Sequence, residues 1–158
     1  MDLSIVNCTF HNNTATQSGV VLSSSNMKST QSNLVFTDNI ITNNYCAGNG
    51  AVFYFVVASF KTRSSNNVYK YNQAGGSGGV GYFFSSDANF VETGATYLSN
   101  TAVDFGGNWF INIKAIGTNT LAMSFSDTTF ENSYSYESKF FIKGKKLIHL
   151  IRWRSILS

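Results

Sequence analysis

The chain of 158 residues contains no proline, only two cysteines and few charged residues. Two cysteines are too few for the disulfide framework of a small secreted domain, and nothing marks Cys8 and Cys46 as a bonded pair. The charged fraction is only 12%, whereas disordered chains are usually rich in charge and poor in aromatic residues. The longest apolar run, residues 51–58, is far shorter than the roughly 20 residues that span a bilayer. The sequence therefore excludes a disulfide scaffold, a disordered chain and a membrane-spanning helix.

What the chain does contain favours β-structure. Hydrophobic residues make up 43% of it and aromatic residues 15%, and asparagine, serine, threonine and glycine dominate the rest. β-Branched and aromatic residues pack well in strands, while asparagine and glycine favour turns. We expect an all-β chain of many short strands in one domain.

A repeat organises these residues. Its pattern is a large apolar residue, then Asn three positions later, a small residue five positions later and Gly nine positions later. Four copies are complete: Phe10, Asn13, Ala15 and Gly19; Ile41, Asn44, Cys46 and Gly50; Tyr69, Asn72, Ala74 and Gly78; Tyr97, Asn100, Ala102 and Gly106. A degenerate fifth copy has Phe130, Ser133, Ser135 and Lys139. Chance would give on the order of 0.1 complete copies in a chain of this length, so the repeat is a genuine structural period.

Each position of the repeat has a physical interpretation. The leading residues are expected to point inward and stack on one another in successive coils: Phe10, Ile41, Tyr69, Tyr97 and Phe130. The asparagines are expected to occupy a left-handed bend and to bond to the coils above and below as a ladder: Asn13, Asn44, Asn72 and Asn100. The small residues suit a narrow interior, and the glycines a second bend: Gly19, Gly50, Gly78 and Gly106.

The spacing of these copies predicts the architecture. One strand carries the leading residue, a second follows the glycine and a third precedes the next copy, without helical periodicity. This pattern indicates a right-handed parallel β-helix of about five coils with three short strands each. We expect loops at 23–33 and 61–67, because both stretches are polar, and a short loop between Phe84 and Phe90. The repeats occupy residues 1–142, and residues 143–158 form a separate tail.

The repeat resembles that of a known family. Phe10-x-x-Asn13 followed by Gly19-Val20-Val21 is similar to the FxxN and GGA[I/L/V] repeats of chlamydial polymorphic outer-membrane proteins. Similar repeats occur in large surface proteins of ciliates and other protists, grouped under the pectin-lyase-like fold. The resemblance covers roughly residues 3–142. The second motif is intact only at residues 78–80, since residues 50–52 keep one glycine and residues 106–108 lose the aliphatic residue.

The resemblance implies a secreted or surface-exposed module with a structural or adhesive role and without catalytic residues. We therefore expect an extracellular or cell-surface location, although no signal peptide is visible in this chain. Met1 enters the first coil without a cap, and an uncovered β-helix end exposes pairing edges. We accordingly expect a fragment of a longer protein, with further β-helix coils among its partners.

The alternative is a carbohydrate-binding module or a polysaccharide lyase or hydrolase, because other β-helices have these functions. Glycoside hydrolysis needs two carboxylates that face one cleft. The repeat places Asp104 and Glu137 at equivalent positions of adjacent coils, which makes them weak catalytic candidates. Acids are sparse and no arginine stands near them, so solvated turn residues are the favoured interpretation and an enzyme is less expected than a structural protein.

No cofactor or metal is expected. His11 and His149 are isolated, and the cysteines lack metal-ligand spacing. Cys46 occupies the small inward position of its repeat. The glycine-rich stretch 75–81 lacks the Lys-Ser/Thr of a phosphate-binding loop, so it is expected to be a coil corner.

Surface features suggest glycans or proteins as partners. Four tyrosines fall at outward positions, where they could stack on sugars: Tyr45, Tyr71, Tyr134 and Tyr136. Ordinary outward tyrosines are the favoured interpretation of these four. Asn7 and Asn12 lie in sequons and are candidates for glycosylation in a eukaryotic secretory setting.

Basic residues are concentrated at one end. Residues 1–138 hold five Lys/Arg against eight Asp/Glu, a balance of five minus eight or −3, whereas residues 139–158 hold six Lys/Arg and no acid. A nucleic-acid-binding face would spread its cations over the fold, so no nucleic acid is expected. The tail is expected to be a short helical cap or a truncated continuation. Membrane contact would be weak through this tail or would need a segment outside the sequence.

Overall fold

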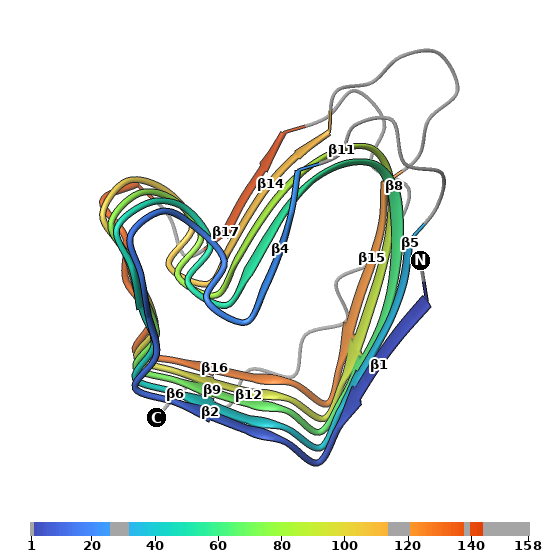
Figure 1. Ribbon diagram of the computed structural model, residues 1–158, viewed down its shortest axis with the longest axis horizontal. Coiled ribbons are helices and arrows are strands. Elements are labelled where there is room, and N and C mark those ends of the chain that lie inside the picture. The colour runs from blue at the N-terminus through green and yellow to red at the C-terminus, as the bar shows by residue number, and fades with distance from the viewer. Residues whose placement is uncertain (1, 26–31, 114–120, 138–139, 144–158) are drawn as a thin grey trace.

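The computed structural model describes residues 2–25, 32–113, 121–137 and 140–143. These residues form strands and turns without a helix, and they wind into coils whose strands run parallel (Figure 1). From Phe10 to Phe130 the chain makes four turns. The all-β parallel β-helix expected from the repeat is confirmed. The expected helical cap falls on residues outside the described ranges.

The strands recur in the same order in every coil. The first coil holds β1 (Asp2–Val6), β2 (Thr9–His11), β3 (Thr14–Ala15) and β4 (Leu22–Ser24). The next strands are β5 (Ser32–Thr37), β6 (Ile40–Thr42), β7 (Tyr45–Cys46), β8 (Phe53–Ser65), β9 (Val68–Lys70) and β10 (Gln73–Ala74). They are followed by β11 (Gly81–Thr93), β12 (Thr96–Leu98), β13 (Thr101–Ala102), β14 (Trp109–Ile113), β15 (Leu121–Ser126), β16 (Thr129–Glu131) and β17 (Phe140–Lys143).

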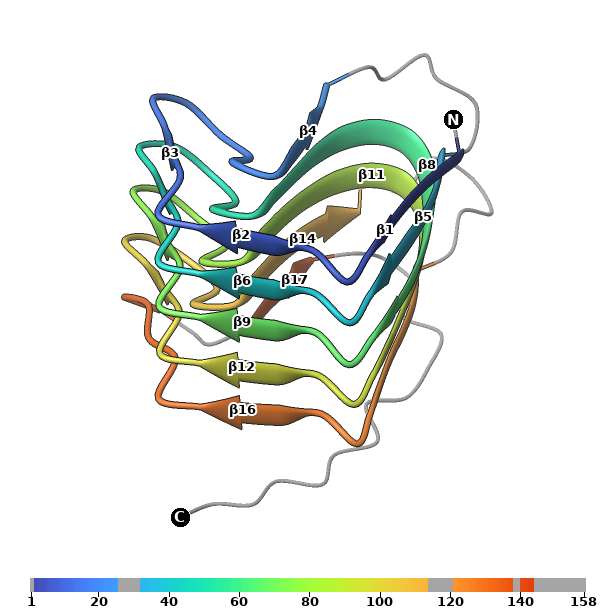
Figure 2. The same cartoon turned by 60° about the horizontal axis from the view of Figure 1, so that its bottom comes forward.

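Three parallel sheets form the walls of the solenoid. A five-stranded sheet has the order β16-β12-β9-β6-β2, a four-stranded sheet β13-β10-β7-β3, and the third sheet runs β1-β5-β8-β11-β14-β17 with β4 and β15 attached. Figure 2 shows the five strands of the first sheet lying one above another. The sheet of two-residue strands was not expected from the sequence. The strand after the glycine and the strand before the next repeat belong to one sheet.

The expected loops at 61–67 and between Phe84 and Phe90 are wrong. β8 and β11 are each 13 residues long, and each curves without interruption within the third sheet (Figure 2). Residues 61–65 alternate between exposed Lys61 and Arg63 and buried Thr62 and Ser64. Because this stretch puts polar side chains on both faces, its composition resembled a loop. Of the expected loop 23–33, both ends belong to strands, and residues 26–31 lie outside the described ranges.

The core is built from aligned side chains of successive coils. The leading residues of the five repeats are register partners: Phe10, Ile41, Tyr69, Tyr97 and Phe130. The rings of Tyr69, Tyr97 and Phe130 stack, with centroids 4.7 Å apart for Tyr69–Tyr97 and 4.6 Å apart for Tyr97–Phe130. Ile41, Tyr69 and Tyr97 are fully buried. Stacking at the strand spacing of a parallel sheet therefore fills the interior along the axis.

Three corners per coil have left-handed backbone. The repeat glycines form one of them, with φ between 64° and 76°: Gly19, Gly50, Gly78 and Gly106. The second corner lies three residues before each stack residue, at Asn7, Asp38, Asn66, Gly94 and Asp127. The third lies just before each ladder position, at Asn12, Asn43, Tyr71, Ser99 and Asn132. The left-handed bend expected at the ladder asparagines is thus wrong by one residue, and these asparagines instead direct their amides into the wall.

The ladder asparagines connect the coils in one direction. Oδ1 of Asn72 accepts two hydrogen bonds from Asn44, one from its backbone N–H at 3.2 Å and one from its side-chain Nδ2 at 2.9 Å. Asn44 receives the same two bonds from Asn13, and Asn100 receives them from Asn72. The Nδ2 group of each receiving asparagine also donates to the carbonyl of the stack residue one coil earlier. The ladder therefore satisfies backbone groups that the corners leave without a strand partner.

The ladder changes at its C-terminal end, where the fifth repeat has serine. Asn108 is fully buried there, and its Oδ1 accepts Nδ2 of Asn100 at 3.2 Å and Oγ of Ser133 at 3.0 Å. A second, shorter ladder joins Cys8, Asn39 and Asn67, because Oδ1 of each asparagine accepts the backbone N–H one coil earlier. Neither this second ladder nor the role of Asn108 was predicted from the sequence.

Gly81 makes room for a large side chain of the next coil. It lies between Phe53 and Trp109 in register, and a Cβ atom at this position would overlap the indole ring of Trp109. Phe53 and Trp109 consequently stack across it, with centroids 6.1 Å apart and planes 6° apart. The glycine and the fully buried tryptophan form a complementary pair.

Gly81→Ala is expected to lower the free energy of unfolding by about 1–3 kcal/mol, because the added methyl overpacks the core. Urea unfolding of the purified variant measures the loss. In a Trp109→Phe background the same substitution should cost less than half as much, since the smaller ring leaves space. An equal cost in both backgrounds would show that the indole does not set the requirement for glycine.

Candidate functional site

Among the described residues, the interior contains one carboxyl group, which was not predicted from the sequence. Glu92 lies in β11 in register with Ser64 of β8 and Phe125 of β15, and it is fully buried. The hydroxyl of Tyr97 donates to its Oε2 at 3.1 Å, while Oε1 has no hydrogen-bond partner among the described residues. Its inward position follows from alternation along the strand, since Phe90 is buried and Val91 is exposed. That alternation was the available signal in the sequence.

Burial determines the charge of this group. It raises the pKa of Glu92 to about 8, and the polar neighbours Ser64, Tyr97 and Asn67 offset only part of the rise. The pKa values of Tyr69 and Tyr97 are raised well above the usual tyrosine value, mainly by burial and also by the negative charge that Glu92 would carry. At neutral pH Glu92 is therefore a protonated acid surrounded by neutral phenols.

A neutral buried carboxylic acid is the type of group that serves as a general acid in catalysis. Catalysis also requires that a substrate reach the acid. Glu92, Tyr69 and Tyr97 are all fully buried between the walls, as is Trp109. The cluster consequently belongs to the core, and its chemistry is not available to ligands.

The two acids expected as weak catalytic candidates lie on the outside. Asp104 and Glu137 are exposed, and the bridge between Thr101 and Tyr134 keeps their segments in equivalent positions of adjacent coils. The backbone N–H of Asp104 donates to the carbonyl of Gly76 at 3.1 Å. Neither acid lines either of the two hollows described below.

Both cysteines and His11 lie among the described residues. Among the described residues no group of three or more His, Cys, Asp or Glu side chains is placed to hold an ion. Cys8 and Cys46 are free thiols, and burial raises the pKa of Cys46. Cys46 lies in the narrow column of small residues formed with Ala15, Ala74 and Ala102. Nδ1 of His11 is 2.7 Å from Oγ1 of Thr42 on the exposed surface.

The outward tyrosines are exposed but scattered. Their exposed fractions range from 40% to 80%, for Tyr45, Tyr71, Tyr134 and Tyr136. A different set, Tyr54, Tyr82 and Phe110, forms a column with ring centroids 5.4 and 4.7 Å apart. Since these rings cover one another's faces, the column leaves little ring surface for a sugar to stack on.

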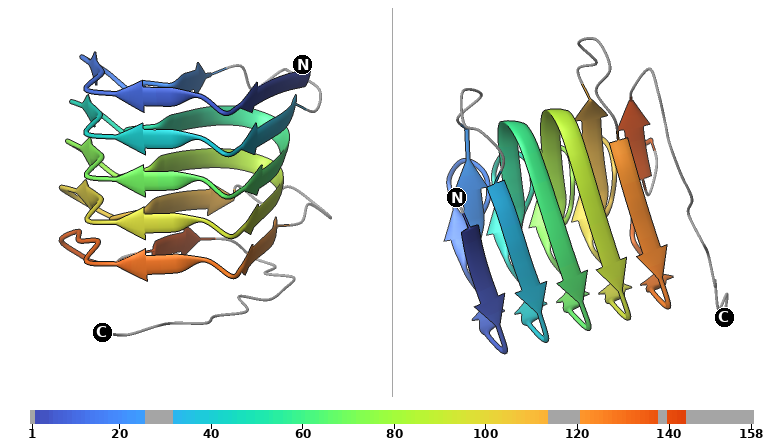
Figure 3. Two further views of the ribbon diagram at one scale, coloured as in Figure 1. Left: turned by 90° about the horizontal axis from the view of Figure 1, so that it is seen from below. Right: turned by 90° about the vertical axis from the view of Figure 1, so that its right-hand side faces the viewer.

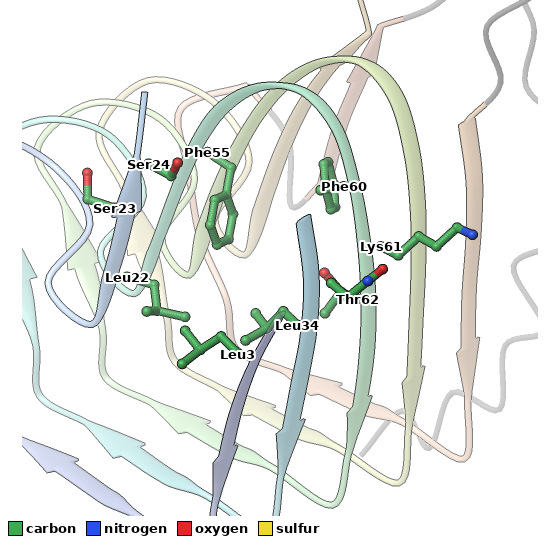
Figure 4. Close-up of a pocket in the computed structure, with 10 residues that line it drawn as sticks. Leu3, Leu22, Ser23, Ser24, Leu34, Phe55, Phe60, Lys61 and Thr62 are labelled. Atoms are coloured by element: carbon green, nitrogen blue, oxygen red, sulfur yellow. The ribbon is translucent and has the colours of Figure 1, made fainter. Parts of the chain in front are cut away.

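Two hollows lie beside β5 and β8 in the described part of the chain. The first, of about 40 Å³, lies at the β1–β4 end and is lined mainly by apolar side chains, among them Leu3, Leu22 and Phe55 (Figure 4). The second, of about 290 Å³, lies on the outer face of β5 and β8. Its lining residues are Asn33, Leu34, Val35, Lys61 and Arg63.

Comparisons with known proteins do not extend this picture. No family model, curated protein or solved structure matches the chain. In the described part of the chain no helix is long and apolar enough to cross a membrane.

Proposed function

We propose that this chain is a non-enzymatic structural or adhesive β-helix module of a larger cell-surface or secreted protein. The main support is that the polar groups of its interior bond to one another within the fold. The ladder amides bond coil to coil, and the buried acid is sealed among aromatic rings. Such an interior stabilises a rigid rod, and contacts with partners are left to the outer faces of the walls.

The β1–β4 face supports stacking on a further coil. Asn13 is exposed, and among the described residues no group donates to its Oδ1, whereas the same atom of Asn44, Asn72 and Asn100 accepts two N–H groups. Figure 3 shows β1 and β2 at the outer edge of the stack. An uncovered edge of this kind favours pairing with another strand. We propose further coils of the same repeat as its partner.

A surface location is supported by the resemblance of the repeat to the FxxN repeats of polymorphic outer-membrane proteins and protist surface proteins. Asn7 and Asn12 are exposed at corners of the first coil, where a glycan would meet solvent. We propose these two sequons as sites of glycan attachment.

Incubation of the purified chain with pectic, uronic and neutral polysaccharides tests the absence of catalysis. We expect no new reducing ends and no unsaturated products. Cleavage that disappears in Asp104→Asn or Glu137→Gln would overturn the proposal in favour of a lyase or hydrolase. The matched control is Glu131→Gln, an exposed acid at the end of β16.

The second candidate function, carbohydrate binding without cleavage, is favoured by one observation. The hollow on the outer face of β5 and β8 is lined by two cations. Carbohydrate binding is compatible with the structural role, since an adhesive module needs a surface that binds its ligand.

A further inference from the structure

Lys61 and Arg63 form a pair of cations on one outer wall. They alternate in β8 with buried Thr62 and Ser64, so both side chains leave the same face, about 6.6 Å apart along the strand. Lys61 points outward in Figure 4. The two residues line the hollow of about 290 Å³ together with Asn33 and Val35 of β5.

The register determines their neighbours. Lys61 is flanked by Asn33 on one side and Asn89 on the other, and Arg63 by Val35 and Val91. Both valines are exposed, at 40% and 38%. The wall therefore presents two cationic groups beside carboxamides and small apolar surfaces.

These cations are not neutralised within the described part of the chain. Neither forms an ion pair there, and Glu92 of the adjacent strand points into the core. The nearest acid in the column of Lys61 is Asp2, two strands away, whose Oδ1 accepts Nδ2 of Asn33 at 2.6 Å. Asp87 lies further along β11, where its Oδ2 accepts Oγ of Ser59 at 3.4 Å. A positive potential is thus left over the hollow.

The donors around the hollow suit a sulfate group. Lys61 and Arg63 are donors only, and the carboxamide of Asn33 has a second N–H beyond the one given to Asp2. Three donor groups from two neighbouring strands can serve three terminal oxygens, whereas a carboxylate offers two. Arginine binds such oxyanions through its planar fork, and lysine as a point charge.

Resting on the proposed adhesive function, we propose that Lys61, Arg63 and Asn33 bind the sulfate ester groups of a sulfated polysaccharide. Val35 and Val91 then lie beside the sugar ring. The outward columns beside the hollow, on β1, β5, β15 and the C-terminal parts of β8 and β11, contain no aromatic ring for base stacking, which argues against single-stranded nucleic acid at this place: Asp2, Asn33, Lys61, Asn89 and Ala122; Ser4, Val35, Arg63, Val91 and Ser124; Val6, Thr37, Ser65, Thr93 and Ser126.

The experiment is a titration of the full chain with heparin, polygalacturonate, dextran and oligo(dT) at moderate salt. We expect heparin to bind more tightly than polygalacturonate and dextran not to bind. The double variant Lys61→Gln/Arg63→Gln should lose about tenfold in heparin affinity, the sum of two partly exposed charge contacts. Both side chains are exposed, so unchanged circular dichroism and an unchanged melting temperature should accompany the loss.

The matched control is Lys70→Gln, which removes a cation from β9 on a different wall and should change the affinity less than twofold. Heparin affinity that is unchanged in the double variant would overturn the inference by assigning binding to other cations, including those of residues 139–158. Equal, site-dependent binding of polygalacturonate or oligo(dT) would overturn the sulfate assignment, as would no binding of heparin. Cleavage of a polysaccharide would instead overturn the proposed structural function, so the two failures are distinguishable.

Discussion

Glu92→Gln is expected to raise the free energy of unfolding at pH 7 by about 2–3 kcal/mol, although it alters a fully buried polar cluster of the fold. The amide oxygen of glutamine can accept the Tyr97 hydroxyl as Oε2 does now. Its NH₂ group replaces the acidic O–H and cannot ionise. The substitution therefore keeps the shape of the side chain and removes the linkage between folding and protonation.

The pH dependence of this effect follows from the two pKa values. In the folded chain the pKa of Glu92 is about 8, whereas the value without burial is 4.5. Between these values the unfolded chain releases a proton that the folded chain retains, so rising pH favours unfolding. The stability lost is at most about 1.4 kcal/mol per pH unit, beginning near pH 4.5 and ending above pH 8.

Urea unfolding of both proteins at pH 4.5, 6, 7 and 8.5 measures this difference. The advantage of Glu92→Gln should be smallest at pH 4.5 and should grow to pH 8.5. Glu131→Gln, at an exposed position, should show no such trend. A difference that stays constant with pH would contradict the assignment of a protonated carboxyl group in the core.

Asn72→Ala is expected to lower the free energy of unfolding by about 3–5 kcal/mol, a large part of what a small domain possesses. Asn72 is fully buried and makes four side-chain bonds, accepting two from Asn44 and donating to the Ile41 carbonyl and to Oδ1 of Asn100. Alanine leaves several of these partners buried without a bond. Denaturant unfolding followed by circular dichroism measures the loss.

The matched control is Asn13→Ala, at the exposed end of the same ladder. Asn13 donates to Asn44, but among the described residues its Oδ1 accepts nothing, so about 1 kcal/mol or less is expected. Equal losses for Asn72→Ala and Asn13→Ala would show that the interior ladder does not hold the coils together.

The register of the coils could be predicted because each position of the repeat carries a distinct physical demand. A stack residue must be large and apolar, and the position between Ala15 and Ala74 must be small, which Cys46 satisfies. These demands recur in every coil, so even five short copies are recognisable. The same logic could have found the second ladder at Asn39 and Asn67, where only two of the five coils carry asparagine.

Other features could not be predicted from composition. Thr62 and Ser64 are buried polar residues, so the strand that contains them does not show the usual alternation of apolar and polar residues. Gly81 appeared to be one more glycine of a corner until its fit to Trp109 was visible. Asp104 and Glu137 fell at equivalent positions, but sequence register does not show whether a cleft encloses them.

Disulfide cross-linking between coils tests the stacked register most directly. In a Cys8→Ser/Cys46→Ala background, Thr42→Cys/Lys70→Cys joins register partners of β6 and β9, whose Cα atoms lie at the strand spacing of about 4.8 Å. Thr42→Cys/Leu98→Cys joins positions two strands apart, at about 9.6 Å, which is too far for a disulfide. The account predicts that mild oxidation cross-links the first pair and leaves the second reduced. Efficient cross-linking of the second pair, or none of the first, would contradict the register.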